Sequence, residues 1–365
     1  MNIPQSKYEF IKTRILEDIE KGIYENNDKI PSENELCRLY DTSRITVRKA
    51  LDELTAQGIL YRLQGVGSFV KRDVKDGQTA DVEKILLVLP NYPELFSSGI
   101  VSDVLIGIEE VLEKTEFSFV TVMEPRNEED NEKFIQNIID IKPMGIIYSF
   151  YFNSDLQGEL KKLNVPIVFL DSEPKDNMFD VVTGEDFESA YRATQLLLME
   201  GYKKIGFYSQ WSSSFSTCKL RCEGTKQALR DSNIKIKDEW FSVSESVPMY
   251  HEAIMRFDTV TDIKSYLKRN EELEALVAMN DSTSLAAYKA IAELGKSIPK
   301  DLKLISYGNY NWTAFYEGGL TSYEQYFSNY GKEAAKLVLQ RINNEIPAIQ
   351  QRRIMKYDFI RRKSF

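Results

Sequence analysis

Apolar residues near the start of the chain recur every three or four positions, which is the spacing of one face of an α-helix. In residues 8–19 they stand at positions 8, 11, 15 and 19, and Gly22 follows as a helix stop. Ser32 and Glu35 then have the spacing of a capping box, which predicts a second helix that ends near Tyr40. The chain is therefore expected to begin with two helices.

A third helix and a hairpin are predicted directly afterwards. Ser43 is placed to cap a helix that runs through Leu54 with valine, alanine and leucine side chains on one face. Gly58 ends this helix, and the strand-like runs ILYRL and SFVKR follow on either side of a glycine-containing turn at 64–67. Three helices followed by a hairpin make a winged helix-turn-helix.

From Lys84 onward the pattern changes to apolar runs that are typical of buried parallel strands, and these alternate with amphipathic helices. The runs are ILLVLP, FSFVTVME, MGIIYSF, VPIVFLD, DVVTGED, KIGFYSQ, ALVAMND and LKLISYG. Such alternation predicts a doubly wound parallel-sheet α/β body. Residues 72–83 are polar and aperiodic, so we expect a winged head over 1–71, a linker over 72–83 and the body over 84–365.

The small number of histidines and cysteines restricts the chemistry that the chain supports. Its one histidine, His251, stands in no Ser-His-Asp, two-histidine metal or HExxH motif. Cys37, Cys218 and Cys222 lack a zinc spacing and are too few for a disulfide framework, so we expect reduced thiols. These features favour a protein that is not an enzyme and that binds no metal or cofactor.

The hydropathy and charge of the chain indicate whether it contacts a membrane and which part of it contacts DNA. No apolar run is long enough to span a bilayer and the N-terminal residues do not resemble a secretory signal, so a cytoplasmic protein without membrane contact is expected. Residues 1–72 hold twelve Lys/Arg and eleven Asp/Glu, a net of +1, so the remainder carries −10 of the total charge of −9. DNA contacts are therefore expected from the head and not from the acidic body.

The third predicted helix carries the side chains best suited to DNA. Arg44 and Arg48 stand four positions apart near its start and so project from one face. A guanidinium fork matches guanine or a phosphate, and the second helix of a helix-turn-helix presents its first turns to the major groove. Ser43 and Thr46 are small donors for phosphates or bases. The alternative for the two arginines is a solvated helix face.

The order of these pieces resembles the DNA-binding head of the GntR family, and the match runs almost without a gap from Ile30 to Val70 through PSENEL, SRITVRKAL and GVGSFV. One departure is Asn34, which stands where many members carry a basic residue. Glycine-containing backbone at the wing tip suits contact with the minor groove or a phosphate. The predicted DNA-binding residues are Ser32, Ser43, Arg44, Thr46, Arg48, Gln64 and Gly65.

The body resembles the LacI/GalR repressors, which share their fold with periplasmic sugar-binding proteins. The resemblance covers about Lys84 to Phe365 and lies in motifs that follow one another in the family's order: VPIVFLD, VVTGED, GYKKIGF, LRCEGTKQAL, VAMND, SIPKDLKLISYGN and LTSYEQYFSNYGKEAAKLVL. It implies a two-lobed, effector-binding and dimerising domain. Gly308 and Asn309 stand where the family often has two aspartates, so the effector cannot be copied from a hexose-binding relative.

The resemblance also implies the effector contacts, which fall at the carboxyl ends of strands where open α/β sheets bind ligands. Asp171 would accept from sugar hydroxyls, Arg221 would donate to them and pair with Asp171, and Asn280 would do both. Asp171 as a loop acid, Asn280 as a helix cap and Trp211 as a packing residue are the structural alternatives. The predicted effector-binding residues are Asn91, Asp171, Arg221, Asn280, Gln325, Phe327 and Trp211.

A head of the first family on a body of the second resembles the arabinose-responsive repressors, which implies L-arabinose, a pentose, as the effector. We expect a homodimer that represses carbohydrate genes from a palindromic operator and leaves it when the sugar closes the two lobes. Three alternatives stay open: a sugar-binding protein without a regulatory role, an enzyme of the ribokinase or dehydrogenase type, and a regulator that responds to another sugar, a phosphosugar or a nucleoside.

Overall fold

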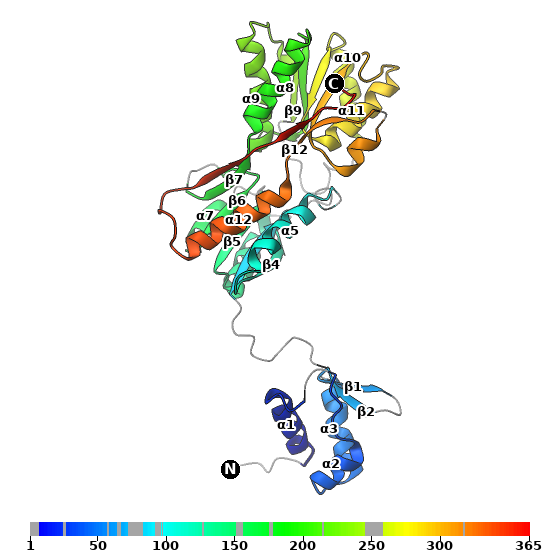
Figure 1. Cartoon of the computed structure of the whole chain (residues 1–365), viewed down its shortest axis with the longest axis vertical. Helices are drawn as coiled ribbons and strands as arrows, with labels where there is room; N and C mark the ends of the chain where they lie inside the picture. Colours follow the sequence, from blue (N-terminus) through cyan, green and yellow to red (C-terminus); the bar gives the residue numbers. More distant parts are fainter. Residues whose placement is uncertain are drawn as a thin grey trace. The chain divides into compact units, whose positions relative to one another are not determined.

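The computed structural model separates into two compact units, Met1–Val82 and Glu83–Phe365 (Figure 1). It describes residues 7–24, 27–56, 58–63, 67–71, 83–91, 96, 98–125, 128–150, 156–174, 178–213, 215–244, 258–316 and 318–365. Most of the predicted linker, the wing tip and His251 lie outside these ranges. Among the described residues, no helix combines the length and the apolar character that crossing a membrane requires.

The first unit contains three helices and a two-stranded hairpin. These are α1 (Lys7–Glu20), α2 (Glu33–Leu39), α3 (Arg44–Ala56), β1 (Leu60–Leu63) and β2 (Gly67–Val70), and the two strands pair antiparallel. The apolar faces seen in the sequence form one core, in which Ile11 and Ile15 of α1 pack with Val47, Leu51 and Leu54 of α3. The predicted winged helix-turn-helix is present.

The second unit contains two six-stranded sheets, and each forms one lobe. The first lobe has the strand order β13-β7-β6-β5-β3-β4, and all of its neighbouring strands are parallel. Its strands are β3 (Lys84–Leu89), β4 (Ser118–Met123), β5 (Gly145–Ser149), β6 (Ile167–Leu170), β7 (Asp180–Gly184) and β13 (Arg352–Met355). Its helices are α5 (Ile100–Leu112), α6 (Asn131–Ile141), α7 (Gln157–Lys162) and α12 (Phe327–Ile342), with a 3₁₀ turn at Glu128–Asp130.

The second lobe has the strand order β14-β12-β11-β10-β8-β9, and only β14 is antiparallel to its neighbour. Its strands are β8 (Ile205–Ser212), β9 (Phe241–Ser244), β10 (Ala275–Ala278), β11 (Lys303–Gly308), β12 (Thr321–Glu324) and β14 (Asp358–Ile360). Its helices are α8 (Asp186–Met199), α9 (Ser216–Asp231), α10 (Asp258–Arg269) and α11 (Asp281–Glu293), with 3₁₀ turns at Asp238–Trp240 and Asn311–Phe315.

The helices cover both faces of each sheet. In the first lobe, α5 and α12 lie side by side on one face (Figure 1), and they approach so closely that a Cβ on Gly107 would stand 1.8 Å from the Ser328 carbonyl oxygen. Apolar residues of α6 and α7 pack on the other face. In the second lobe, α8 and α9 cover one face, and α10 and α11 cover the other. This arrangement confirms the predicted doubly wound α/β body.

The chain passes between the two lobes three times: from β7 to α8, from β12 to α12, and from β13 to β14. We call these three short connections the hinge strands and define them as residues 184–186, 325–326 and 356–357. Together they form the covalent link between the lobes, so any closure of the lobes on a ligand has to be absorbed there.

Candidate functional site

A cavity of about 80 Å³ lies at the carboxyl ends of the strands and is lined from both lobes. This is several times the space that one water molecule needs. The lining residues are Ile100, Phe150, Asp171, Ser172, Trp211, Phe215, Thr217, Arg221, Met279, Asn280, Tyr310, Gln325 and Phe327. Six of the seven predicted effector-binding residues are brought together here. Asn91, at the end of β3, is half-buried and is not part of this lining.

Asp171 follows β6 directly and is held in the left-handed region with a φ of 65°. Aspartate adopts this conformation more readily than most residues. Its Oδ1 is buried, and none of the described residues donates a hydrogen bond to it. Burial raises the pKa of Asp171, and the nearby Asp186 raises it further, whereas Arg221 lowers it. An acceptor atom of this kind needs a donor from a ligand or from water.

Arg221 projects from α9 and is only 3% exposed. Its Nε donates to Asp186 Oδ1 at 2.7 Å, and one terminal nitrogen donates to the Met279 carbonyl oxygen at 2.6 Å. The guanidinium carbon stands 4.0 Å from the centre of the Tyr307 ring. The predicted ion pair between Arg221 and Asp171 was wrong. Arg221 pairs instead with Asp186, the first residue of α8, whose Oδ1 lies 2.7 Å from a guanidinium nitrogen.

Asn280, which the sequence left open as an effector contact or a helix cap, both lines the cavity and caps a helix. It lines the cavity, and its Oδ1 accepts from the backbone nitrogen of Thr283 at 2.9 Å as the N-cap of α11. The same oxygen also accepts from Thr283 Oγ1 at 2.8 Å. Because the carbonyl oxygen is engaged in capping, the amide nitrogen is the group that Asn280 offers to the cavity.

Aromatic side chains form the rest of the wall. Phe327 begins α12, and its ring centre lies 6.1 Å from that of Phe150. Trp211 meets Phe215 edge to face at 5.6 Å. Apolar rings beside a few buried polar groups are the usual composition of a small-molecule site. Trp211 thus both packs and lines the cavity.

Sequence reasoning missed several residues of this site. Tyr310 lines the cavity and follows the Gly308-Asn309 pair that departs from the family pattern. Its backbone nitrogen donates to the buried Asp281 Oδ2 at 3.0 Å, so Asp281 fixes this part of the wall. The departure at 308–309 was the signal that could have pointed to Tyr310.

Four of the predicted DNA-binding residues, Ser43, Arg44, Thr46 and Arg48, lie around the start of α3. The Arg44 and Arg48 side chains are 65% and 59% exposed, and both stand beside Glu33 of α2. Arg48 donates to the two Glu33 carboxylate oxygens at 3.1 and 2.9 Å, whereas Arg44 is 3.9 Å away. The hydrogen bonds from Arg48 lower the pKa of Glu33. Sequence reasoning missed this carboxylate.

Two predicted DNA contacts also have local structural roles. Ser32 caps α2 in the predicted capping box, with its backbone nitrogen 2.7 Å from Glu35 Oε2. Ser43 Oγ accepts from the Thr46 backbone nitrogen at 3.3 Å and lies 2.9 Å from Thr46 Oγ1. Gln64 and Gly65 lie outside the described residues.

No group of three or more histidine, cysteine, aspartate or glutamate side chains within the described ranges is placed to hold a metal ion. The buried thiols Cys218 and Cys222 are free, and burial raises their pKa to about 12 and about 11.

Comparisons with known proteins agree with this architecture. Residues 7–70 match bacterial regulatory proteins of the gntR family, and residues 194–365 match the periplasmic binding protein-like domain. The chain therefore joins a GntR-type DNA-binding domain to a periplasmic-binding-protein-like domain. It is a DNA-binding transcriptional regulator.

Individual relatives cover almost the whole regulator. The arabinose metabolism transcriptional repressor of Halalkalibacterium halodurans is 24% identical over 93% of this chain and 90% of its own length. The repressor of the same name from Geobacillus stearothermophilus is 23% identical over 92% and 91%. Because these relatives are repressors, the prediction that the chain is not an enzyme is confirmed.

A solved structure shows the same fold. The complex of the transcriptional regulator CelR with cellobiose superposes with a TM-score of 0.69 at 20% identity, over 88% of this chain and 90% of that chain. At this level of identity the likeness concerns the fold alone.

Proposed function

We propose that this regulator is a repressor of carbohydrate-utilisation genes that leaves its operator when a small neutral sugar binds in the cavity. L-arabinose is the proposed effector. The head is proposed to bind double-stranded operator DNA through the predicted set around Arg44 and Arg48.

The observation that carries the effector class is the charge and hydrogen-bonding state of the cavity. Asp171 lines it and Asp186 stands directly behind it, and among the lining residues that the structure describes only Arg221 is cationic. Asp171 Oδ1 and Asp186 Oδ2 are buried and accept no hydrogen bond from any described residue. Such a site favours a neutral ligand with several hydrogen-bond donors, and the hydroxyl groups of a sugar are donors.

The same observation disfavours a phosphosugar. A helix N-terminus can bind a phosphate, and α5, α9 and α12 begin at this cavity, but beside two carboxylates a phosphate also calls for a free arginine or lysine. Arg221 is already committed to Asp186 and to the Met279 carbonyl oxygen. Lys203, Lys204 and Lys219 are not part of the lining.

Support for L-arabinose in particular comes from the relatives. Two repressors of arabinose metabolism match more than nine-tenths of the chain. The small cavity is consistent with one monosaccharide. A sugar-binding protein without a regulatory role is disfavoured because the winged head is present.

The regulator is further proposed to act as a homodimer on a palindromic operator. An apolar surface in the second lobe supports this, and we define it as Leu285, Trp312, Phe315 and Tyr316. Phe315 is 87% exposed, which is unusual for so large an apolar side chain unless another molecule covers it.

A thermal-shift titration tests the effector class. L-arabinose is expected to raise the melting temperature of the body, whereas ribose 5-phosphate and adenosine are expected to leave it unchanged. Asp171→Asn keeps the shape of the side chain but removes its negative charge, and it should abolish the effect of the sugar. Lys219→Ala, in the same lobe as Arg221 but outside the cavity lining, is the control that keeps the response. No shift with any pentose or hexose would overturn the sugar proposal, and a shift with the phosphosugar alone would replace it.

A further inference from the structure

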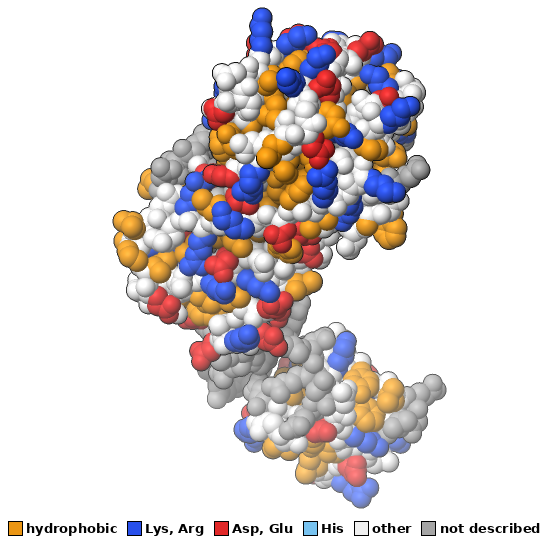
Figure 2. Space-filling view, turned by 45° about the horizontal axis from the view of Figure 1, so that its top comes forward, with side chains coloured by type: hydrophobic (Ala, Val, Ile, Leu, Met, Phe, Trp, Pro, Cys, Tyr) orange, Lys and Arg blue, Asp and Glu red, His pale blue; other side chains and the backbone are white. Residues whose placement is uncertain are grey.

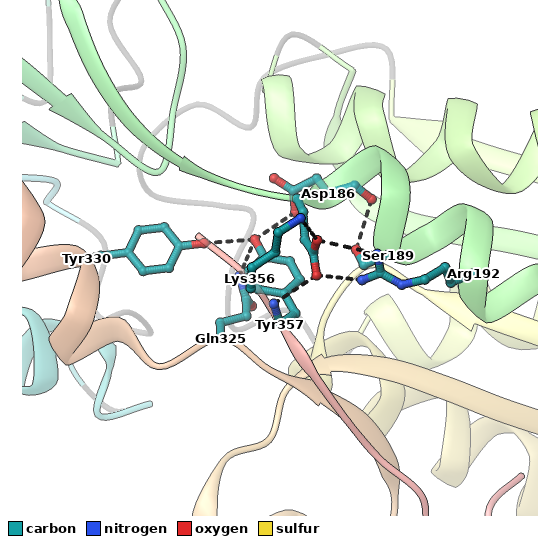
Figure 3. A network of polar contacts seen from close by, with 8 residues as sticks. Asp186, Ser189, Arg192, Gln325, Tyr330, Lys356 and Tyr357 are labelled. Carbon is teal, nitrogen blue, oxygen red and sulfur yellow. Dashed lines mark hydrogen bonds and ion pairs between the residues drawn. The ribbon is translucent and has the colours of Figure 1, made fainter. Parts of the chain in front are cut away.

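One buried tyrosine forms hydrogen bonds that link the hinge strands to one another. Tyr357 lies in the third hinge strand and is 5% exposed. Figure 3 shows its hydroxyl between Asp186, Gln325 and Tyr330, which come from α8, from the second hinge strand and from α12. One side chain thus contacts elements of both lobes.

The hydrogen bonds of this hydroxyl are complete. Gln325 Nε2 donates to it at 3.1 Å and the Tyr330 hydroxyl donates to it at 2.9 Å. It donates in turn to Asp186 Oδ1 at 3.2 Å. A hydroxyl has one hydrogen to give and two lone pairs to receive with, so the position of Tyr357 is fully specified. A Cβ on Gly184 would stand 1.6 Å from this oxygen, so the Tyr357 hydroxyl fits here only because residue 184 is a glycine.

The hinge and the cavity are linked at two places: Gln325 lines the cavity and donates to the Tyr357 hydroxyl, and Asp186 joins Tyr357 to Arg221. Asp186 Oδ1, which accepts from Tyr357, also accepts from Arg221 Nε at 2.7 Å. Arg221 lines the cavity, whereas Tyr357 does not. A ligand that draws Arg221 or Asp186 toward itself therefore changes the hydrogen bond of the hinge tyrosine directly.

The backbone around Tyr357 is held by a second carboxylate. Glu185 is 2% exposed and accepts from the Tyr357 backbone nitrogen at 2.9 Å, from Lys356 Nζ at 2.9 Å and from Arg192 at 2.5 Å. The Glu185 nitrogen donates to the Met355 carbonyl oxygen at 3.0 Å. These hydrogen bonds join the first hinge strand to the third. A displacement of Asp186 can therefore be transmitted to α12 of the first lobe through the Tyr357 and Tyr330 hydroxyls.

We propose that Tyr357 is a positioning residue for the effector response: its hydroxyl couples the Arg221–Asp186 pair to the relative placement of the two lobes. This inference rests on the proposed function of the cavity. Burial and the neighbouring Asp186 raise the pKa of Tyr357 well above its ordinary value. The hydroxyl therefore keeps its hydrogen, and its role as a donor, across the neutral range.

The test compares two buried tyrosines of the full-length protein. Tyr357→Phe removes the coupling hydroxyl. Tyr266→Phe is the matched control, because the Tyr266 hydroxyl is also buried, donates to the Trp240 carbonyl oxygen at 2.7 Å and lies 2.3 Å from a Cβ built on Gly206, but it is remote from the hinge strands. For each variant the affinity for DNA selected from a random-sequence pool is measured with and without saturating L-arabinose, alongside the melting temperature.

Both variants are expected to melt at similar temperatures and to bind the DNA alike without sugar. The ratio of DNA affinities without and with sugar should fall about tenfold for Tyr357→Phe and stay unchanged for Tyr266→Phe, a change within the usual range of allosteric coupling. Tyr330→Phe keeps Tyr357 itself and should lower the ratio in the same direction by a smaller factor, so it provides a second reading if Tyr357→Phe folds poorly.

Two results would overturn the inference. If wild type responds to the sugar and the Tyr357 and Tyr330 variants keep its full ratio, the coupling role is wrong while the sugar-responsive function stands. If wild type itself shows no change with any sugar, the proposed function fails, and the inference fails with it.

Discussion

The residues of the cavity show how charge selects a ligand. Two carboxylates, Asp171 and Asp186, each have a buried oxygen atom and stand near the buried Arg221, the one cation among the described lining residues. Removing one partner of a buried ion pair is costly because it leaves the other charge uncompensated. In the free protein one of the two carboxylates therefore lacks a charge partner, which is electrostatically unfavourable. Hydrogen bonds from the hydroxyl groups of a ligand would offset this cost.

A prediction at this scale concerns Asp281, which holds the Tyr310 wall of the cavity. Burial raises the pKa of Asp281 from 3.8 to about 6, although hydrogen bonds to the carboxylate act in the opposite direction. Between about pH 4 and 6 the folded state thus binds more protons at this position than the unfolded state. The contribution of Asp281 to the free energy of unfolding is therefore greatest at low pH and decreases as the pH rises through 6, by roughly 3 kcal/mol at most.

Asp281→Asn isolates this contribution, because it cannot titrate. All three tryptophans lie in the body, so urea unfolding followed by tryptophan fluorescence reports on the domain that contains Asp281. The stability advantage of wild type over Asp281→Asn is expected to shrink between pH 4.5 and pH 7. A constant difference over this interval would show that the carboxyl group does not titrate there.

At the scale of elements, periodicity and caps predicted most of the fold. The three helices of the head and the eight apolar strands of the body are present because each buries a face that the sequence displays. Strands β9, β12, β13 and β14 were not predicted: FSVS and TSYE are short and rich in polar residues, RRIM carries two arginines, and DFI is only three residues long. The hinge tyrosine Tyr357 lies between them in no recognised motif. Its role depends on contacts that cross more than 170 residues of sequence, which no local pattern records.

Substitutions in α3 test its proposed role as the helix that reads DNA. Arg44→Ala and Arg48→Ala are each expected to weaken binding to selected DNA by about tenfold or more, since one bidentate base contact is worth about 1–3 kcal/mol. Arg14→Ala is the matched control, because Arg14 also pairs with a neighbouring carboxylate, Glu17 at 2.9 Å, but lies on α1.

Anisotropy measured at several salt concentrations separates the two kinds of contact. An arginine that binds a phosphate lowers the salt slope by about one when it is removed, whereas one that reads a base leaves the slope unchanged and relaxes sequence preference. If DNA binding is as tight without both arginines as with them, α3 is not the reading helix.

At the scale of the whole molecule, DNA binding and sensing belong to different units. Basic and acidic side chains are interspersed on the face of the body that Figure 2 shows, and the body carries the net negative charge. Attraction to DNA is therefore expected from the head, and the effector and a second copy of the chain are proposed to bind the body.

The apolar surface around Phe315 yields the prediction for assembly. Phe315→Glu places a charge in the centre of this surface and is expected to convert a dimer into a monomer at micromolar concentration, because burying an unpaired charge in an interface is strongly unfavourable. Ile349→Glu is the control, since Ile349 is 70% exposed outside that surface. Sedimentation velocity distinguishes the two states. A Phe315→Glu protein that sediments like wild type would place the interface elsewhere.

We propose that one chain reads DNA with its head and senses a sugar with its body. The most direct measurement is the affinity of the full-length protein for a palindromic DNA site selected from a random pool, titrated with L-arabinose at fixed salt. We expect the sugar to weaken binding by about ten- to a hundredfold, and we expect Asp171→Asn, which binds the same DNA, not to respond. A wild-type affinity that stays constant up to millimolar concentrations of L-arabinose and of other pentoses and hexoses would contradict the proposal.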